Sequence, residues 1–175
     1  MKINKIALQM DLIEKIDFDY DSSFLLAIEA QKRGYEIFYY NPSDLEYKNS
    51  KIFASGFYIE LFDNKNDYFK FISKKISINL DEFDVVLIRQ DPPFDMNYIS
   101  STYLLEHLPS STIVLNNPTS VRNCSEKIYP FQFREFMPPT IVTQNIESIK
   151  KFLLENKDIV TKPLYGNGGE GIFRT

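Results

Sequence analysis

An unbroken apolar run, Val85-Val86-Leu87-Ile88, is the clearest hydrophobic pattern in the chain. Such a run predicts a strand in a sheet that is covered on both faces. Residues 6–10, 36–40 and 113–116 are short apolar segments of the same kind, and amphipathic segments separate them. Alternating strands and helices are typical of an α/β domain with a mainly parallel sheet. We therefore predict this fold for residues 1–120.

Two helices are predicted from their end signals. Asp21-Ser22-Ser23 precedes an apolar face and Gly34 ends it, whereas Asp95 is placed to cap a helix over 96–107. Ser22 and Ser23 could also hold an anion at a helix N-terminus, although ordinary capping is the commoner role.

The remaining segments are predicted as follows. Residues 51–61 alternate and contain Gly56, which indicates an inserted hairpin. Further along the chain we expect a short helix at 67–74, a strand at 140–143, a helix at 146–155 and a strand at 158–162. A domain boundary near 121–125 gives two domains, 1–122 and 123–175.

Four of the six glycines lie between Gly166 and Gly171, directly after the predicted strand 158–162. Exposed N–H groups of such a loop can cradle phosphate oxygens, and Lys162 could add a positive charge. A dinucleotide fingerprint would have to open a helix, but Ile172-Phe173 favours a strand. No Gly-Lys-Ser/Thr follows, which excludes a P-loop. A flap over phosphates remains, with a plain glycine-rich turn as the alternative.

Arg89 and Asp91 follow the strand 85–88, at the sheet edge where ligands bind in open α/β folds. Pro92 and Pro93 stiffen the backbone that aims them. Arginine offers a planar fork for a carboxylate or phosphate. The alternative is an ion pair of Arg89 with Asp91 or Asp95 that only fixes the loop.

Composition and charge narrow the function classes. A net charge of −4 argues against a nucleic-acid surface. One cysteine, Cys124, and one histidine, His107, leave no disulfide framework and no Cys/His zinc site. Because no apolar segment suits a signal peptide or a membrane span, we expect a cytoplasmic protein without a membrane partner.

Several motifs together resemble bacterial glutathione synthetase, a ligase of the ATP-grasp family, from Met1 to the last residue. They are Met10-Asp11, Asp21-Ser22-Ser23-Phe24, Glu29-Ala30-Gln31-x-Arg33-Gly34-Tyr35-Glu36, Arg89-x-Asp91-Pro92-Pro93-Phe94-Asp95, Asn117-Pro118, Ser120-x-Arg122-x-Cys124-x-Glu126-Lys127, Lys162-Pro163-Leu164 and Gly166-x-Gly168-Gly169 with Ile172-Phe173-Arg174. The resemblance implies a pre-ATP-grasp domain followed by the beginning of an ATP-grasp nucleotide-binding subdomain.

The family joins γ-glutamylcysteine to glycine, using ATP to form an acyl phosphate. The resemblance implies that Lys127 and Lys162 contact ATP and that the glycine loop closes over its phosphates. It also suggests a homo-oligomer. We expect Arg89 to bind a carboxylate of the dipeptide and Asp91 to orient it or bind its amine. The expected ATP-binding residues are Lys127, Lys162, Gly166, Asn167, Gly168, Gly169 and Gly171.

The sequence departs from the family pattern in length, because members continue well beyond Thr175. The half that is missing here carries the Mg²⁺-binding carboxylates and Asn, so we assign neither metal ligands nor catalytic residues in this chain. We expect the 175 residues alone not to catalyse ligation. Leu12 and Tyr165 are minor departures. The alternatives are another ATP-grasp carboxylate–amine ligase and a truncated, non-catalytic binding fragment.

Overall fold

The computed structural model describes residues 3–166 and 168–175. The chain forms two compact units. The first unit comprises Met1–Asp91 and Asp95–Arg122, and the second comprises Pro92–Phe94 and Asn123–Thr175.

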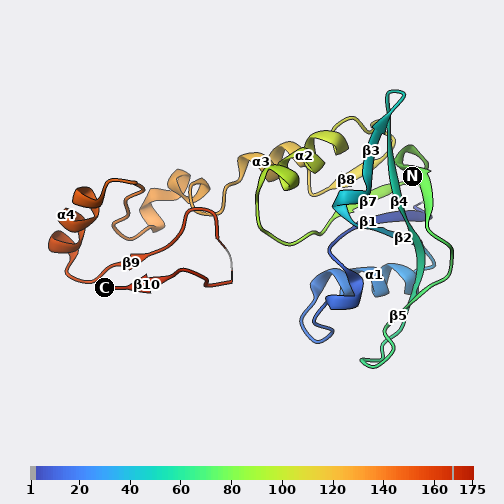
Figure 1. Ribbon diagram of the computed structural model, residues 1–175, viewed down its shortest axis with the longest axis horizontal. Coiled ribbons are helices and arrows are strands. Elements are labelled where there is room, and N and C mark those ends of the chain that lie inside the picture. Colours follow the sequence, from blue (N-terminus) through green and yellow to red (C-terminus); the bar gives the residue numbers. More distant parts are fainter. Residues whose placement is uncertain (1–2, 167) are drawn as a thin grey trace. The chain divides into compact units, whose positions relative to one another are not determined.

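The first unit is built on a parallel sheet in the order β2-β1-β7-β8 (Figure 1). One helix, α1, connects β1 to β2, and α2 connects β7 to β8. The prediction of a mainly parallel α/β domain is confirmed by these pairings. The bounds are β1 (Lys5–Gln9), α1 (Ser22–Lys32), β2 (Glu36–Tyr40), β7 (Val85–Ile88), α2 (Met96–Leu105) and β8 (Ile113–Leu115).

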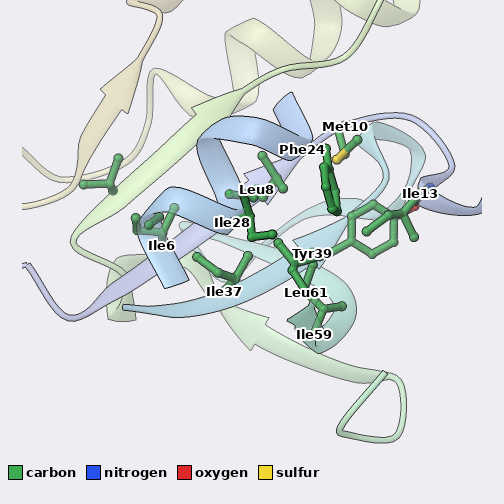
Figure 2. Close-up of a cluster of buried hydrophobic side chains, with 13 residues drawn as sticks. Ile6, Leu8, Met10, Ile13, Phe24, Ile28, Ile37, Tyr39, Ile59 and Leu61 are labelled. Carbon is green, nitrogen blue, oxygen red and sulfur yellow. Dashed lines mark hydrogen bonds between the residues drawn. The ribbon is translucent and has the colours of Figure 1, made fainter. Parts of the chain in front are cut away.

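Both faces of this sheet are covered. Ile6 and Leu8 of β1 belong to the apolar cluster that includes Phe24 of α1 (Figure 2). Ala7, between them in sequence, belongs to a second cluster that includes Leu105 of α2. Because successive strand residues point to opposite faces, α1 and α2 pack on opposite sides of the sheet. This arrangement explains why β1 and β7 are apolar without alternation.

An antiparallel extension adds four strands around β4, which pairs with β2, β3, β5 and β6. The predicted hairpin within 51–61 is wrong, because these residues form one continuous strand. A Cβ at Gly56 would lie 2.2 Å from the Tyr39 carbonyl oxygen, so this glycine permits a close approach of β4 to β2. The bounds are β3 (Leu45–Lys48), β4 (Lys51–Leu61), β5 (Phe69–Phe71) and β6 (Ile76–Asn79).

The helix predicted at 67–74 is also wrong, because β5 occupies this segment. Phe69 and Phe71 pack against the α1-side cluster, and the Phe71 ring stacks on Phe57 of β4 at a centroid distance of 4.2 Å. Tertiary packing of these aromatic rings favours the strand over the local helical pattern.

The predicted helix signals are confirmed. The Asp21 carboxylate accepts the Phe24 N–H at 2.8 Å, and the Asp95 carboxylate accepts the N–H groups of Asn97 and Tyr98 at 2.9 Å. Gly34 ends α1 with a φ of 85°. The described residues also form the 3₁₀ helices η1 (Ile13–Lys15), η2 (Pro42–Asp44), η3 (Leu80–Glu82) and η4 (Tyr129–Phe136).

In the described part of the second unit, one α-helix and one small hairpin follow α3 (Pro118–Asn123). Its helix, α4 (Ile146–Asn156), confirms the prediction for 146–155. The hairpin pairs β9 (Val160–Thr161) with β10 (Phe173–Arg174) and encloses the glycine loop. The strand predicted at 140–143 is wrong, since this segment has no ladder partner among the described residues. In the described part of the chain, no helix is long and apolar enough to cross a bilayer.

Two neighbouring tyrosines of β2 predict opposite effects of removing a hydroxyl group. The Tyr39 hydroxyl donates to the Asp11 carbonyl at 3.1 Å and accepts the Ile13 N–H at 3.3 Å. The Tyr40 hydroxyl is buried without a partner among the described residues, and burial raises its pKa well above the ordinary value. We expect Tyr39→Phe to lower the free energy of unfolding by about 1 kcal/mol, whereas Tyr40→Phe should be neutral or stabilising. Urea unfolding of both variants measures the difference, and an equal loss would contradict it.

Candidate functional site

The site candidate in the first unit lies where β1 and β7 end side by side. The connection after β1 passes over one face of the sheet and the connection after β7 passes over the other. In open α/β sheets, ligands bind in the crevice outside the strand ends at such a switch point. The Arg89 N–H donates to the Gln9 carbonyl at 2.8 Å, which extends the β1–β7 pairing up to the edge. Gln9 and Gln90 are also joined through a buried side-chain hydrogen bond.

A crevice of about 300 Å³ opens at this edge, and both predicted residues line it. Its wall also includes Asp11 from the loop after β1 and Ser22 and Ser23 from the start of α1. A larger hollow of about 610 Å³ lies over the start of β2 and the later part of β4, at Tyr58, Ile59 and Glu60. None of the described residues that line this hollow is basic and no crossover diverges there, so the smaller crevice is the better candidate.

The Arg89 guanidinium is held by two hydroxyl groups. Its Nε donates to Ser23 Oγ at 3.0 Å and its Nη2 donates to Ser22 Oγ at 2.6 Å. The two serines are neutral, so they fix the guanidinium without cancelling its charge. Among the described residues, Arg89 forms no ion pair with Asp91 or Asp95. The alternative of a purely structural ion pair is therefore wrong.

Asp91 is placed by its neighbour across the strand ends. Its backbone N–H donates to Asp11 Oδ2 at 2.6 Å. Burial raises the pKa of the Asp91 carboxyl, and the carboxylates of Asp11 and Asp21 raise it further, whereas Arg89 lowers it. The crevice thus carries an excess of negative charge beside one fixed guanidinium.

Three of the residues that shape this crevice were not assigned to a site from sequence. Asp11 could have been found, because it follows β1 and the carboxyl ends of parallel strands share one edge. Ser22 and Ser23 were interpreted as capping residues, but Asp21 caps α1 and the two hydroxyl groups accept hydrogen bonds from Arg89. Their partner lies 66 or 67 residues away, which no local pattern indicates.

The glycine loop of the second unit has the backbone that the sequence predicted. Gly168, Gly169 and Gly171 have φ angles of 59°, 82° and 67°. Apart from the chain neighbours, no heavy atom of the described residues lies within 4 Å of a Cβ built on Gly168 or Gly169. A Cβ on Gly171 would lie 2.8 Å from Pro163 Cγ, so the hairpin itself excludes a side chain there. Asn167, also predicted as a ligand-binding residue, lies outside the described residues.

The two predicted lysines differ in their surroundings. Lys127 Nζ donates to the Gly166 carbonyl at 2.6 Å and lies 3.7 Å from Glu126 Oε1, so Lys127 anchors the start of the loop. Lys162 is exposed at the end of β9 and has no side-chain partner among the described residues. An exposed ammonium and exposed glycines with positive φ in one hairpin are suited to an anion such as a phosphate group.

The described residues were also compared with the ligand set that a metal ion needs. In residues 3–166 and 168–175, no group of three or more His, Cys, Asp or Glu side chains could hold a metal ion. The described residues therefore do not fit a magnesium site, which needs a set of oxygen ligands around the cation.

Comparison with protein-family models shows which family the chain belongs to. Residues 4–122 match the model of the prokaryotic glutathione synthetase N-terminal domain, and residues 126–175 match that of the prokaryotic glutathione synthetase ATP-grasp domain. The chain belongs to the prokaryotic glutathione synthetase family. The resemblance inferred from the motifs is confirmed, and so is the order of a pre-ATP-grasp domain followed by the start of an ATP-grasp domain.

Individual members of the glutathione synthetase family are similar to this chain along nearly its whole length. The glutathione synthetase of Agrobacterium fabrum is 45% identical over 174 residues, which cover 99% of this chain and 54% of the relative. That of Mesorhizobium japonicum is 45% identical over 169 residues, which cover 97% of this chain and 54% of the relative. The glutathione synthetase of Buchnera aphidicola subsp. Schizaphis graminum is 43% identical over 171 residues, which cover 97% of this chain and 53% of the relative. The chain thus spans about half the length of the curated relatives it matches.

A solved structure supports the fold. D-alanyl-alanine synthetase A from Vibrio cholerae matches all of this chain and 53% of its own chain, with a TM-score of 0.54 and 15% identity. This likeness concerns architecture alone.

The charge excess in the crevice predicts that Asp91→Asn stabilises the folded chain near neutral pH. Since the folded-state pKa of Asp91 is raised, the folded chain binds this proton more tightly than the unfolded chain. Ionisation of Asp91 therefore lowers the free energy of unfolding as the pH rises above the carboxyl pKa of the unfolded chain. Asn carries no charge and removes this loss of stability. We expect a gain of at most about 1 kcal/mol, because solvent screens the site.

Thermal unfolding between about pH 4 and pH 7 measures this difference, which should shrink toward the acidic end. Asp63→Asn, at an exposed position, is the control. A loss of stability for Asp91→Asn at neutral pH would show that the carboxylate has a structural role instead.

Proposed function

We propose that this chain is the dipeptide-binding domain and the first part of the nucleotide-binding domain of a glutathione synthetase. The reaction joins γ-glutamylcysteine to glycine at the expense of ATP. The observation that carries the proposal is the Arg89 guanidinium, held by two neutral serines in a switch-point crevice, in a chain matched along its length by this family. A fixed guanidinium that forms no ion pair with the described residues is suited to a substrate carboxylate.

The chemistry takes place in two steps. A carboxylate oxygen of the dipeptide attacks the γ-phosphorus of ATP, forming an acyl phosphate and releasing ADP. The glycine amine then attacks the acyl carbon, forming the amide as phosphate leaves and the amine loses a proton. Phosphoryl transfer needs positive groups around the phosphates, and the acyl phosphate needs protection from water.

We assign these tasks to residues as follows. Lys127, Lys162 and the glycine loop at Gly166–Gly171 bind the ATP phosphates and cover them as a flap. Arg89 and Asp91 line the dipeptide site. Mg²⁺ would help to neutralise the phosphates when bound, but no step is assigned to it because the described residues do not fit a metal site. A cytoplasmic location, expected from the sequence, and a homo-oligomer, suggested by the family resemblance, are proposals of the same kind.

Ligase activity tests this assignment when the chain is joined to the remaining C-terminal portion of the Agrobacterium fabrum relative. With ATP, magnesium, γ-glutamylcysteine and glycine, the joined protein should form glutathione. In this protein, Arg89→Ala should raise the KM for the dipeptide by one to two orders of magnitude, roughly 1.5–3 kcal/mol for a charged hydrogen bond.

Arg33→Ala is the matched control, since Arg33 is exposed and pairs with Glu29 on α1 at 2.8 Å. Circular dichroism checks that each protein is folded. A folded joined protein that ligates another carboxylate and amine but not these substrates would favour the reading of a different ATP-grasp ligase. An unchanged KM for Arg89→Ala would limit Arg89 to a scaffolding role.

A further inference from the structure

We propose that Arg122 is a positioning residue, which holds α3 against α2 and so fixes the place where the chain leaves the first unit. The first unit ends at Arg122, and the two family models match residues 4–122 and 126–175. Residues 123–125 therefore connect the two matched domains. The inference rests on the proposed function only for its effect on catalysis, because ligation needs groups from both domains.

The helix α3 is too short to be held by apolar packing. Of its six residues, all of them described, only Pro118 is buried. The Val121 N–H donates to the Asn117 carbonyl at 2.9 Å, but a helix of this length is marginal in water on its own hydrogen bonds. A contact from outside α3 is needed to fix it.

The Arg122 side chain supplies this contact on one face of α2. Its Nη1 donates to Thr102 Oγ1 at 3.0 Å, and its Nη2 donates to Glu106 Oε1 at 2.6 Å. Its Cζ lies 4.1 Å from the centre of the Tyr103 ring, which adds a cation–π contact. Because the Arg122 side chain is only 14% exposed, water weakens the ion pair less than it would at an open surface.

The surface that Arg122 contacts is itself rigid. Thr102 is fully buried, and its hydroxyl donates to the Ile99 carbonyl at 2.7 Å. Since this hydroxyl has one proton and uses it there, its oxygen is left as an acceptor for Arg122. The next turn of α2 is fixed to the sheet by the buried side chain of Leu105.

The acid at this contact lies where a negative charge is unfavourable without a cation. Glu106 is the C-cap residue of α2, where the helix dipole favours positive charge, and the described last turn of α2 contains no basic residue. Hydrogen bonds from Thr119 and Arg122 lower the pKa of the Glu106 carboxyl below its ordinary value. Both donors belong to α3, so the charge at the end of α2 joins the two helices.

The α2–α3 contact lies between the two candidate sites along the chain. The helix α2 follows the segment that carries Arg89 and Asp91, and α3 precedes Lys127. Phosphoryl transfer requires that the dipeptide carboxylate and the γ-phosphate meet, and a misplacement of about 1 Å can cost about a hundredfold in rate. Arg122 touches neither substrate in this account, so its loss should slow the reaction without weakening the binding of either substrate.

Hydrogen exchange followed by NMR on the 175-residue chain tests the contact itself. We expect Arg122→Ala to speed the exchange of the Ser120 and Val121 N–H groups by about tenfold, while exchange in β1 and β7 stays unchanged. Arg122→Lys keeps the charge but not the planar fork, so its exchange should be intermediate. Arg33→Ala is the matched control, because Arg33 pairs with Glu29 within α1 and its side chain is 65% exposed. Unchanged exchange in α3 for both folded Arg122 variants would overturn the proposal.

Steady-state kinetics of the joined protein tests the positioning role. Arg122→Ala should lower kcat by about 10- to 100-fold and change the KM values for ATP and the dipeptide by less than about threefold. Arg122→Lys should recover part of kcat, and Arg33→Ala should change none of these values. A raised KM with an unchanged kcat, or an unchanged kcat despite faster exchange in α3, would contradict the positioning role.

Failure of this inference can be distinguished from failure of the proposed function. If the joined protein makes glutathione at the same kcat with and without the Arg122 side chain, the ligase assignment stands and the positioning role is wrong. If the joined protein makes no glutathione, the ligase assignment is wrong, and the exchange measurement alone decides whether Arg122 holds α3.

Discussion

The parallel pairing of β1 with β7 is the constraint on which the rest of the first unit depends. Its register runs from Ile6 opposite Val85 to Gln9 opposite Ile88. Apolar side chains on both faces fix this register, because a slip of one residue would move each of them to the other face. With the register fixed, Asp11 must emerge beside Asp91, and Arg89 must face the start of α1. The geometry of the crevice is therefore a consequence of the packing of the core.

In the second unit, local backbone conformation positions the glycine loop. Its hairpin has only two residues in each strand, and the loop conformation is determined by glycines with positive φ and by contact with Pro163. Arg174 adds a contact to the Asp158 carboxylate at 2.6 Å that joins the two sides of the hairpin. Because backbone conformation is a local property, the glycine loop could be interpreted from its sequence, whereas the partner of Lys127, 39 residues away, could not.

The difference between local signals and long-range contacts also explains which predictions were right. The run 85–88 and the caps Asp21 and Asp95 are local signals, and they correctly indicated a strand, two helices and the edge that carries Arg89 and Asp91. Gly56 suggests a hairpin from sequence alone, because sequence cannot distinguish a turn glycine from one that admits a neighbouring strand. The local pattern of 67–74 favours a helix, and it does not reveal the strand because the ring of Phe57, on which Phe71 stacks, is not a sequence neighbour.

In a crystal structure of the 175-residue chain with γ-glutamylcysteine, we expect the dipeptide in the crevice at the ends of β1 and β7, with a carboxylate about 2.7–2.9 Å from the Arg89 guanidinium nitrogens. A dipeptide bound elsewhere, or absent from the crevice at saturating concentration, would contradict the assignment of Arg89 to the dipeptide site.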